Sequence, residues 1–192
     1  DNKNINYEKY LIPKSERDQI INHIQQMEEV LLVSPQIRIN GLISNGKIST
    51  IFIGHGIPPS DVEVFNSHSK LGNLLEIDGT QLTQENEQGI GVAHGLAKML
   101  DLSLGDYIVL FTNTIDGQMN AVNGDVLHLF KTDSSALDDK AIRMPLQLAL
   151  DLYDTEKVDR LAVLLSGDNY TENMYDKVQK YLQSQNINAS VY

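Results

Sequence analysis

The sequence predicts a mixed fold of helices and strands (α/β, in the α+β sense) with two lobes. A helical pattern near the N-terminus runs into strand patterns, and a strand followed by a helix lies near the C-terminus, so both ends can build one α/β lobe. The middle of the chain is richer in strands, and glycines and prolines cluster at residues 54–59. We therefore expect an α/β lobe of residues 1–55 and 157–192 and an inserted mixed, strand-rich lobe of residues 56–156.

The first expected element is a helix that begins near Ser15. Serine is a favoured N-cap, and Glu16 and Asp18 in the next turn suit the positive end of a helix. Apolar residues then recur at helical spacing, at Ile20, Ile21, Ile24, Met27 and Val30. We expect this helix to bury that stripe and to run to about residue 30.

A long hairpin is expected next. Strand-like residues lead into the dipeptide Asn45-Gly46, which is a strong signal for a tight hairpin turn. The returning strand makes a hairpin over residues 37–53. The glycines and prolines that follow are expected to end its ladder.

The inserted lobe opens with polar, irregular residues 60–88, in which weak signals of order occur around residues 62–65 and 74–77. Its ordered elements are expected to be a short strand that leads through Gly91 into an amphipathic turn at 93–100, and strands at 108–111 and 125–130. A further helical turn or two is expected at 146–153, with Pro145 as a natural first-turn residue. The dipeptides Asp116-Gly117 and Asn123-Gly124 are typical of hairpin turns.

The C-terminal elements return to the first lobe. Residues 160–165 have the composition of a buried strand, and Thr171 is a suitable cap for a helix. The apolar face of that helix is Met174, Val178, Tyr181 and Leu182. A last strand is expected from about Ile187.

Composition excludes several classes of function. The net charge of −11 makes binding to nucleic acid phosphates unfavourable, and it also disfavours docking on anionic lipid. The absence of cysteine removes thiol catalysis, cysteine-ligated zinc and disulfides. Apolar runs are far shorter than the roughly 20 residues of a membrane span. The first residue is Asp1 and no signal-like segment follows, so we expect a mature form or a piece excised from a longer protein.

Two motifs suggest chemistry and fail on spacing. In Gly89-x-Gly91-x-x-x-Gly95 the third glycine comes one residue too late for a dinucleotide loop, which favours tight-turn glycines. Ser67 and Lys70 match the S-x-x-K pattern of serine acyl-transferases. The companion motifs are only echoed, in Lys131-Thr132-Asp133 and in Ser166-Gly167-Asp168-Asn169. A secreted serine hydrolase or acyl-transferase that uses Ser67 and Lys70 is therefore kept as an alternative.

Histidines and carboxylates form no strong motif. His55, His68 and His94 could meet in space, but none of the five histidines has metal-ligand spacing. His23 is expected near the surface, and His128 on the more exposed face of a strand. The adjacent Asp138 and Asp139 are better placed for capping or a turn than for sharing a proton. The residues thus predict no catalytic, cofactor-binding or metal site.

Many short segments also occur in an order typical of one family. These segments are a helix into Val33-Ser34-Pro35, the glycine motifs 41–46 and 54–59, Gly79-x-x-Leu82, Gly95-Leu96-Ala97-x-x-Leu100, Leu104-Gly105-Asp106, Asn120-Ala121, Phe130, Leu137-Asp138-Asp139, Met144-Pro145-Leu146 and the strand and helix after Val158. In this order they resemble the extracytoplasmic domain, or MacB-like periplasmic core domain, of ABC transporter permeases of the MacB/LolC–LolE/FtsX-like group.

The resemblance implies a porter-like lobe built from both chain ends, with a mixed lobe inserted into it. It implies a domain on the periplasmic side of the cell inner membrane, without cofactor or catalysis of its own. That domain couples cytoplasmic ATP hydrolysis to export, lipoprotein release or periplasmic signalling. The implied partners are a cognate ABC ATPase subunit, reached through the membrane part, a second permease in a dimer, and a periplasmic adaptor or lipoprotein cargo. A stand-alone periplasmic binding protein remains a further alternative.

Overall fold

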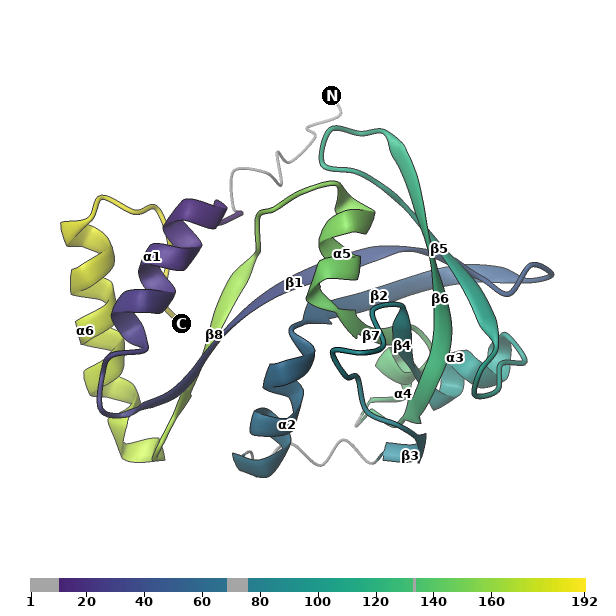
Figure 1. Cartoon of the computed structure of the whole chain (residues 1–192), viewed down its shortest axis with the longest axis horizontal. Coiled ribbons are helices and arrows are strands. Elements are labelled where there is room, and N and C mark those ends of the chain that lie inside the picture. Colours follow the sequence, from purple (N-terminus) through teal and green to yellow (C-terminus); the bar gives the residue numbers. More distant parts are fainter. Residues whose placement is uncertain (1–10, 69–75, 133) are drawn as a thin grey trace. The chain divides into compact units, whose positions relative to one another are not determined.

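The computed structural model describes residues 11–68, 76–132 and 134–192 (Figure 1). Helices and strands mix along the chain, and the main sheet has both parallel and antiparallel neighbours, which confirms the predicted fold class. The chain divides into two compact units. Unit 1 comprises Asp1–Pro35 and Glu156–Tyr192, and unit 2 comprises Gln36–Thr155.

The elements follow one another in this order. The helices are α1 (Lys14–Ile24), α2 (Pro59–His68), α3 (His94–Met99), α4 (Ser135–Asp138), α5 (Leu146–Tyr153) and α6 (Thr171–Ser184), with a 3₁₀ turn η2 (Asp168–Tyr170) before α6. The strands are β1 (Val30–Ser44), β2 (Ser49–Ile57), β3 (Glu76–Gly79), β4 (Gly89–Ala93), β5 (Tyr107–Asn113), β6 (Met119–Phe130), β7 (Ala141–Pro145) and β8 (Arg160–Leu165).

The first boundary between the units differs from the expected one. The expected first lobe ran to residue 55 and so included the hairpin, whereas the structure places Gln36 and the rest of the hairpin in unit 2. The reason is strand pairing, because β1 joins β5 and β2 joins β7 within that unit. The second boundary follows Thr155, close to the expected position.

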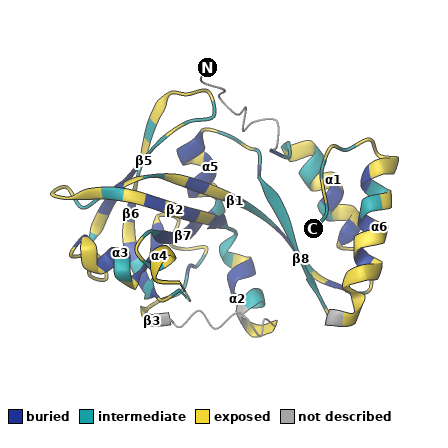
Figure 2. Cartoon of the chain, turned by 180° about the vertical axis from the view of Figure 1, so that it is seen from behind, coloured by how far each residue is buried: buried dark blue, intermediate teal, exposed yellow. Residues whose placement is uncertain are grey.

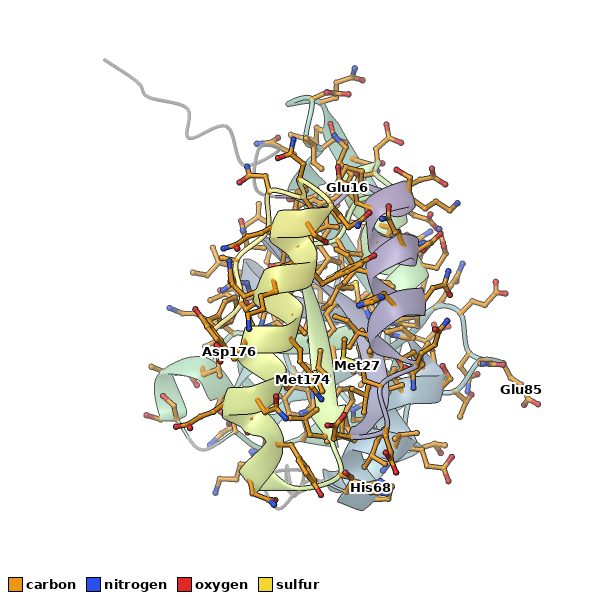
Figure 3. All side chains as sticks on the ribbon, turned by 90° about the vertical axis from the view of Figure 1, so that its left-hand side faces the viewer. Glu16, Met27, His68, Glu85, Met174 and Asp176 are labelled. Carbon is orange, nitrogen blue, oxygen red and sulfur yellow. The ribbon has the colours of Figure 1, made fainter. Side chains whose placement is uncertain are left out.

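Unit 1 packs α1 and α6 around one apolar core. Figure 3 looks onto this unit, with Met27 and Met174 labelled between the two helices. The buried members of the core are Ile20, Ile24, Val30, Val33, Met174, Val178 and Leu182, which include most of both predicted apolar stripes. Leu161, Val163 and Leu165 of β8 pack against it.

Helix α1 is shorter than expected at its C-terminal end. It stops at Ile24, with Gln25 as its C-cap. The Gln25 side chain then bonds the backbone of β1, accepting from the Val33 N–H at 3.0 Å and donating to the Leu31 carbonyl at 3.3 Å. These bonds reverse the chain, so Met27 and Val30 reach the core from a turn and a strand rather than from a helix.

The caps and the last strand also depart from expectation. Pro13 is the N-cap of α1 and Tyr170 that of α6, so Ser15 and Thr171 lie inside the helices. The residues after 186 form no strand, although all of them are described. Alternate residues Ile187, Ala189 and Val191 nevertheless pack against the core of unit 1.

Six strands of unit 2 pair in a closed ring. Strand β1 pairs with β2 and β5, β2 with β7, β7 with β4, β4 with β6, and β6 with β5. Each of the six therefore has a partner on both sides. The predicted hairpin is confirmed, since β1 and β2 pair from Ile37 opposite Gly56 to Ser44 opposite Ser49. Gly46 in its turn has a φ of 86°, which suits glycine.

Several glycines lie inside the strands of the ring, where they allow close packing, and do not end the hydrogen-bonded strand pairs as expected. Gly54 and Gly56 lie within β2, and Gly124 lies within β6 rather than in the expected turn. A Cβ on Gly56 would stand 2.5 Å from the Cβ of Ala149 in α5, and one on Gly124 would meet the Ile90 side chain. These positions lack a side chain because a helix or a neighbouring strand fills the space.

The stretch 60–88, expected to be irregular apart from order signals at 62–65 and 74–77, contains α2 and β3, which overlap those two signals. Helix α2 begins directly after β2, and Pro59 suits a first helical position because its missing N–H would have no partner there. Helix α5 lies against β2, β5, β6 and β7. Its C-terminal carbonyls at Asp151 and Leu152 accept hydrogen bonds from the Asn120 amide at 2.9 and 3.1 Å.

Candidate functional site

The Ser67 motif lies at the wrong end of a helix for acyl transfer. Ser67 is exposed in the last turn of α2, and Lys70 lies outside the described residues. The Ser67 hydroxyl lies 3.0 Å from the Val64 carbonyl and 2.9 Å from Nδ1 of His68. A helix C-terminus carries partial negative charge, which opposes formation of a serine alkoxide. The helix end therefore disfavours a serine nucleophile here, although the His68 imidazole lies within hydrogen-bond distance of the hydroxyl.

A shallow groove of about 650 Å³ lies beside α2. Its walls are Pro59, Ser60, Glu63 and Ser67 on the helix and Gln81, Leu82, Thr83 and Gln84 on the segment before β4. Glu63 is the only titratable side chain among these lining residues, so among them it is the single candidate for a general base.

The candidate histidine site is not formed. His55 is exposed on β2, His68 ends α2 and His94 begins α3, so each lies on a different element. Over the described residues, no group of three His, Cys, Asp or Glu side chains could hold a metal ion. His23 is exposed as expected, and its ring stacks on Tyr181 with centroids 3.6 Å apart.

The expectation for His128 is wrong, because the side chain is buried to 2% exposure. The register between β4 and β6 shifts after Ile90, which places His128 beside Gly91. A Cβ on Gly91 would meet the imidazole ring, so the missing side chain is what admits it. The ring also lies against Phe130, with centroids 5.9 Å apart.

Asp138 has a capping role, but on α3 (His94–Met99) and not ahead of residues 141–146, where capping or a turn was expected. Its Oδ2 accepts a hydrogen bond from the Gly95 N–H at 2.8 Å, and its Oδ1 accepts one from the Thr132 N–H at 2.9 Å. Gly95 lies in the first turn of α3, so a carboxylate of the chain itself occupies the position that an anionic ligand would take. The Gly95 N–H of the glycine motif at 89–95 is therefore already bonded to a carboxylate, which disfavours phosphate binding there.

Two of the ion pairs in unit 1 lower the pKa of a carboxyl group. The Lys177 ammonium donates to Glu29 at 2.6 Å, and this hydrogen bond holds the pKa of the Glu29 carboxyl below its ordinary value. The Lys14 ammonium does the same to Glu156 at 2.7 Å, which lowers the pKa of Glu156. Both pairs are structural contacts on the surface, where such pairs contribute little to stability.

The feature that sequence reasoning missed is an exposed apolar face on the strand ring. Leu42 is 47% exposed, Ile51 52% and Ile53 41%, all on the β1–β2 hairpin. Figure 2 shows exposed residues along this hairpin. The alternation of buried and exposed residues along β2 places Ile51 and Ile53 on the outer side of the ring. The sequence signal for this face is a strand that carries apolar residues at consecutive positions, and therefore on both of its sides, when only one side can face the core.

The fold is known from solved structures. The extracellular domain of the noncanonic ABC-type transporter YknZ from Gram-positive bacteria aligns over 97% of this chain and 90% of its own length, with a TM-score of 0.67 and 13% identity. The chain has the fold of an ABC transporter permease's extracytoplasmic domain. This confirms, for the fold, the predicted resemblance to the MacB-like periplasmic core domain.

Two further structures share the MacB-like fold. The periplasmic region of MacB from Actinobacillus actinomycetemcomitans matches over 88% of this chain and 73% of its own, with a TM-score of 0.64 and 14% identity. A domain of a permease protein from Porphyromonas gingivalis matches over 86% of this chain and 68% of its own, with a TM-score of 0.55 and 13% identity. No family model and no curated protein matches the sequence itself.

Proposed function

We propose that this chain is the extracytoplasmic domain of an ABC transporter permease subunit, and that it acts mechanically rather than as an enzyme. The observation that carries this proposal is the fold match to the YknZ extracellular domain, which spans nearly the whole of both chains. The positions of Ser67 and Asp138 add support, because one is poorly placed for catalysis and the other caps a helix.

In this role the domain responds to ATP hydrolysis in a cognate cytoplasmic ATPase subunit, transmitted through membrane helices of the same permease. A movement that reaches the domain is then used for export, lipoprotein release or periplasmic signalling. The domain works as one half of a permease dimer at the inner membrane and contacts a periplasmic adaptor or a lipoprotein. No helix of the described residues is long and apolar enough to cross a membrane.

Two units are suited to transmitting movement. Each has its own apolar core, and the chain passes between them at Pro35–Gln36 and at Thr155–Glu156. The closed ring resists bending, because no strand of the ring can shift without breaking the hydrogen bonds of two neighbours. A rigid unit of this kind can pass on a displacement instead of absorbing it.

The parent gene tests the proposal. We expect it to encode hydrophobic segments of roughly 20 residues on both sides of this chain. In the full-length permease with its ATPase, a Cys pair that cross-links the two units should lower transport while ATP binding is unchanged. A gene that encodes only a signal peptide and these residues would contradict the proposal.

A further inference from the structure

The groove beside α2 lies between one side of that helix and residues 81–84. Ser60 and Glu63 are three positions apart, so they lie on the same side of α2 and line the groove together. Figure 3 labels His68 at the end of α2 and Glu85 just beyond the other wall. The volume of about 650 Å³ lies within the range of ligand sites, roughly 300–1,000 Å³.

The main chain of residues 81–84 is short of hydrogen bonds. The pairing of β3 with β6 continues to Thr80, whose N–H donates to the Leu127 carbonyl at 3.1 Å. Beyond it, within the described part of the chain, the N–H groups of residues 81–84 form no backbone hydrogen bond, and of their carbonyls only that of Thr83 accepts one. Leu82 is only 4% exposed, so water has little access to its main chain. Buried main-chain groups are almost always paired, so this wall offers unused donors and acceptors to a ligand.

Three side chains on the groove walls are also unengaged. Among the described residues, Glu63, Gln81 and Gln84 take part in no hydrogen bond or ion pair. A glutamine amide carries both donors and an acceptor, which suits the N–H and C=O groups of a peptide main chain. Glu63 adds a carboxylate, which can pair with a cation.

The charge around the groove is negative. The described stretches 48–68 and 76–97 contain no Lys or Arg but six acidic residues, which are Asp61, Glu63, Glu76, Asp78, Glu85 and Glu87. The groove also extends to the last turn of α2, where the helix end carries partial negative charge. A cation is therefore favoured in the groove, and an anionic ligand is repelled.

We infer that this groove binds an extended peptide segment that carries a lysine or arginine side chain. The main chain of the peptide pairs with residues 81–84 in the manner of an added strand, and its cation pairs with Glu63. The inference goes beyond the proposed transport function and does not depend on it, since it concerns the surface of this chain alone.

Titration of the intact chain with blocked peptides tests the inference. The probes are the hexapeptide acetyl-Thr-Ala-Lys-Thr-Ala-Thr-amide, its counterpart with Glu in place of Lys, and two Lys peptides methylated at the odd or at the even main-chain nitrogens. We expect the Lys peptide to bind at least about tenfold more tightly than the Glu peptide and than one of the methylated peptides. It should shift the amide NMR signals of residues 81–84 and should weaken as salt is raised.

Variants assign the binding to this groove. Glu63→Gln should weaken the Lys peptide about fivefold, which is the upper range for an exposed ion pair. Glu172→Gln is the matched control, because Glu172 is an exposed carboxylate on another helix, α6, and its loss should leave binding unchanged. Circular dichroism checks that both variants are folded.

Equal affinity for the Lys and Glu peptides would overturn the inference, as would full binding by both methylated peptides or equal losses in Glu63→Gln and Glu172→Gln. Tighter binding of chitotriose than of the Lys peptide, with shifts at residues 81–84, would also overturn it and would assign the groove to a saccharide. The proposed transport function fails separately, on the flanking segments of the gene.

Discussion

The Asp138 carboxylate accepts a hydrogen bond from the backbone N–H of Gly95, 43 positions earlier in the chain, at 2.8 Å. The same carboxylate accepts one from the N–H of Thr132 at 2.9 Å. One side chain at the end of α4 thereby accepts a hydrogen bond from a backbone N–H in the first turn of α3 and from another in the segment that follows β6. Asp138, the first of the paired aspartates in the sequence, thus has a structural role.

Asp138→Ala should lower the free energy of unfolding by about 1–3 kcal/mol, because it leaves two backbone donors without their acceptor. Asp138→Asn, which retains one oxygen acceptor, should cost less. Chemical denaturation followed by circular dichroism measures both. Asp139→Ala is the control, and an equal loss of stability in Asp139→Ala would argue against the capping role.

Gly56→Ala should destabilise unit 2 by about 1–3 kcal/mol, because the new Cβ would overlap the Cβ of Ala149. The double variant Gly56→Ala with Ala149→Gly removes the overlap, although it places glycine inside a helix. The double variant should therefore lose less free energy of unfolding than the two single variants lose together, and the difference is the coupling energy. Additive effects in this double-mutant cycle would show that the two residues do not meet.

Lys177→Gln should raise the pKa of Glu29 towards its ordinary value, because the hydrogen bond from Lys177 is the main cause of the lowering. A carboxyl with a lowered pKa in the folded state adds stability at pH above its unfolded pKa, and this stability is lost as the pH falls through the folded pKa. NMR titration of the Glu29 carboxyl carbon measures the shift. Lys180→Gln is the control and should leave Glu29 unchanged.

Ser67→Ala should leave every property of the domain unchanged except the local contacts of α2. A fluorophosphonate or β-lactam probe should not label the wild-type chain, because the hydroxyl lies at a helix C-terminus. Labelling that disappears in Ser67→Ala would support the hydrolase alternative and refute a purely mechanical role.

The sequence predicted the elements that local patterns determine. The hairpin follows from Asn45-Gly46 and alternating apolar residues, and α5 follows from an apolar stripe after Pro145. The buried face of α6 follows from helical spacing at Met174, Val178 and Leu182. Each of these signals lies within a short stretch of sequence, so each can be recognised without knowing the fold.

Features that depend on distant partners were missed. The burial of His128 needs the gap at Gly91 on another strand, and the fit of Gly56 needs Ala149 on a helix. The early end of α1 depends on Gln25 bonding the backbone of β1. The exposed face of the hairpin was also missed. Leu42 and Ile51 are apolar residues of the kind found in cores, and only the strand pairing shows that they lie on the outer side of the ring.

The closure of the ring has a consequence for how binding can evolve in this domain. An open sheet can recruit a partner strand by its main chain, whatever its sequence. In the described part of unit 2 the six ring strands already have two neighbours each, so a partner can read the ring only through its side chains. Single substitutions on the outer face can therefore change the side chains that a partner would meet while the backbone stays the same.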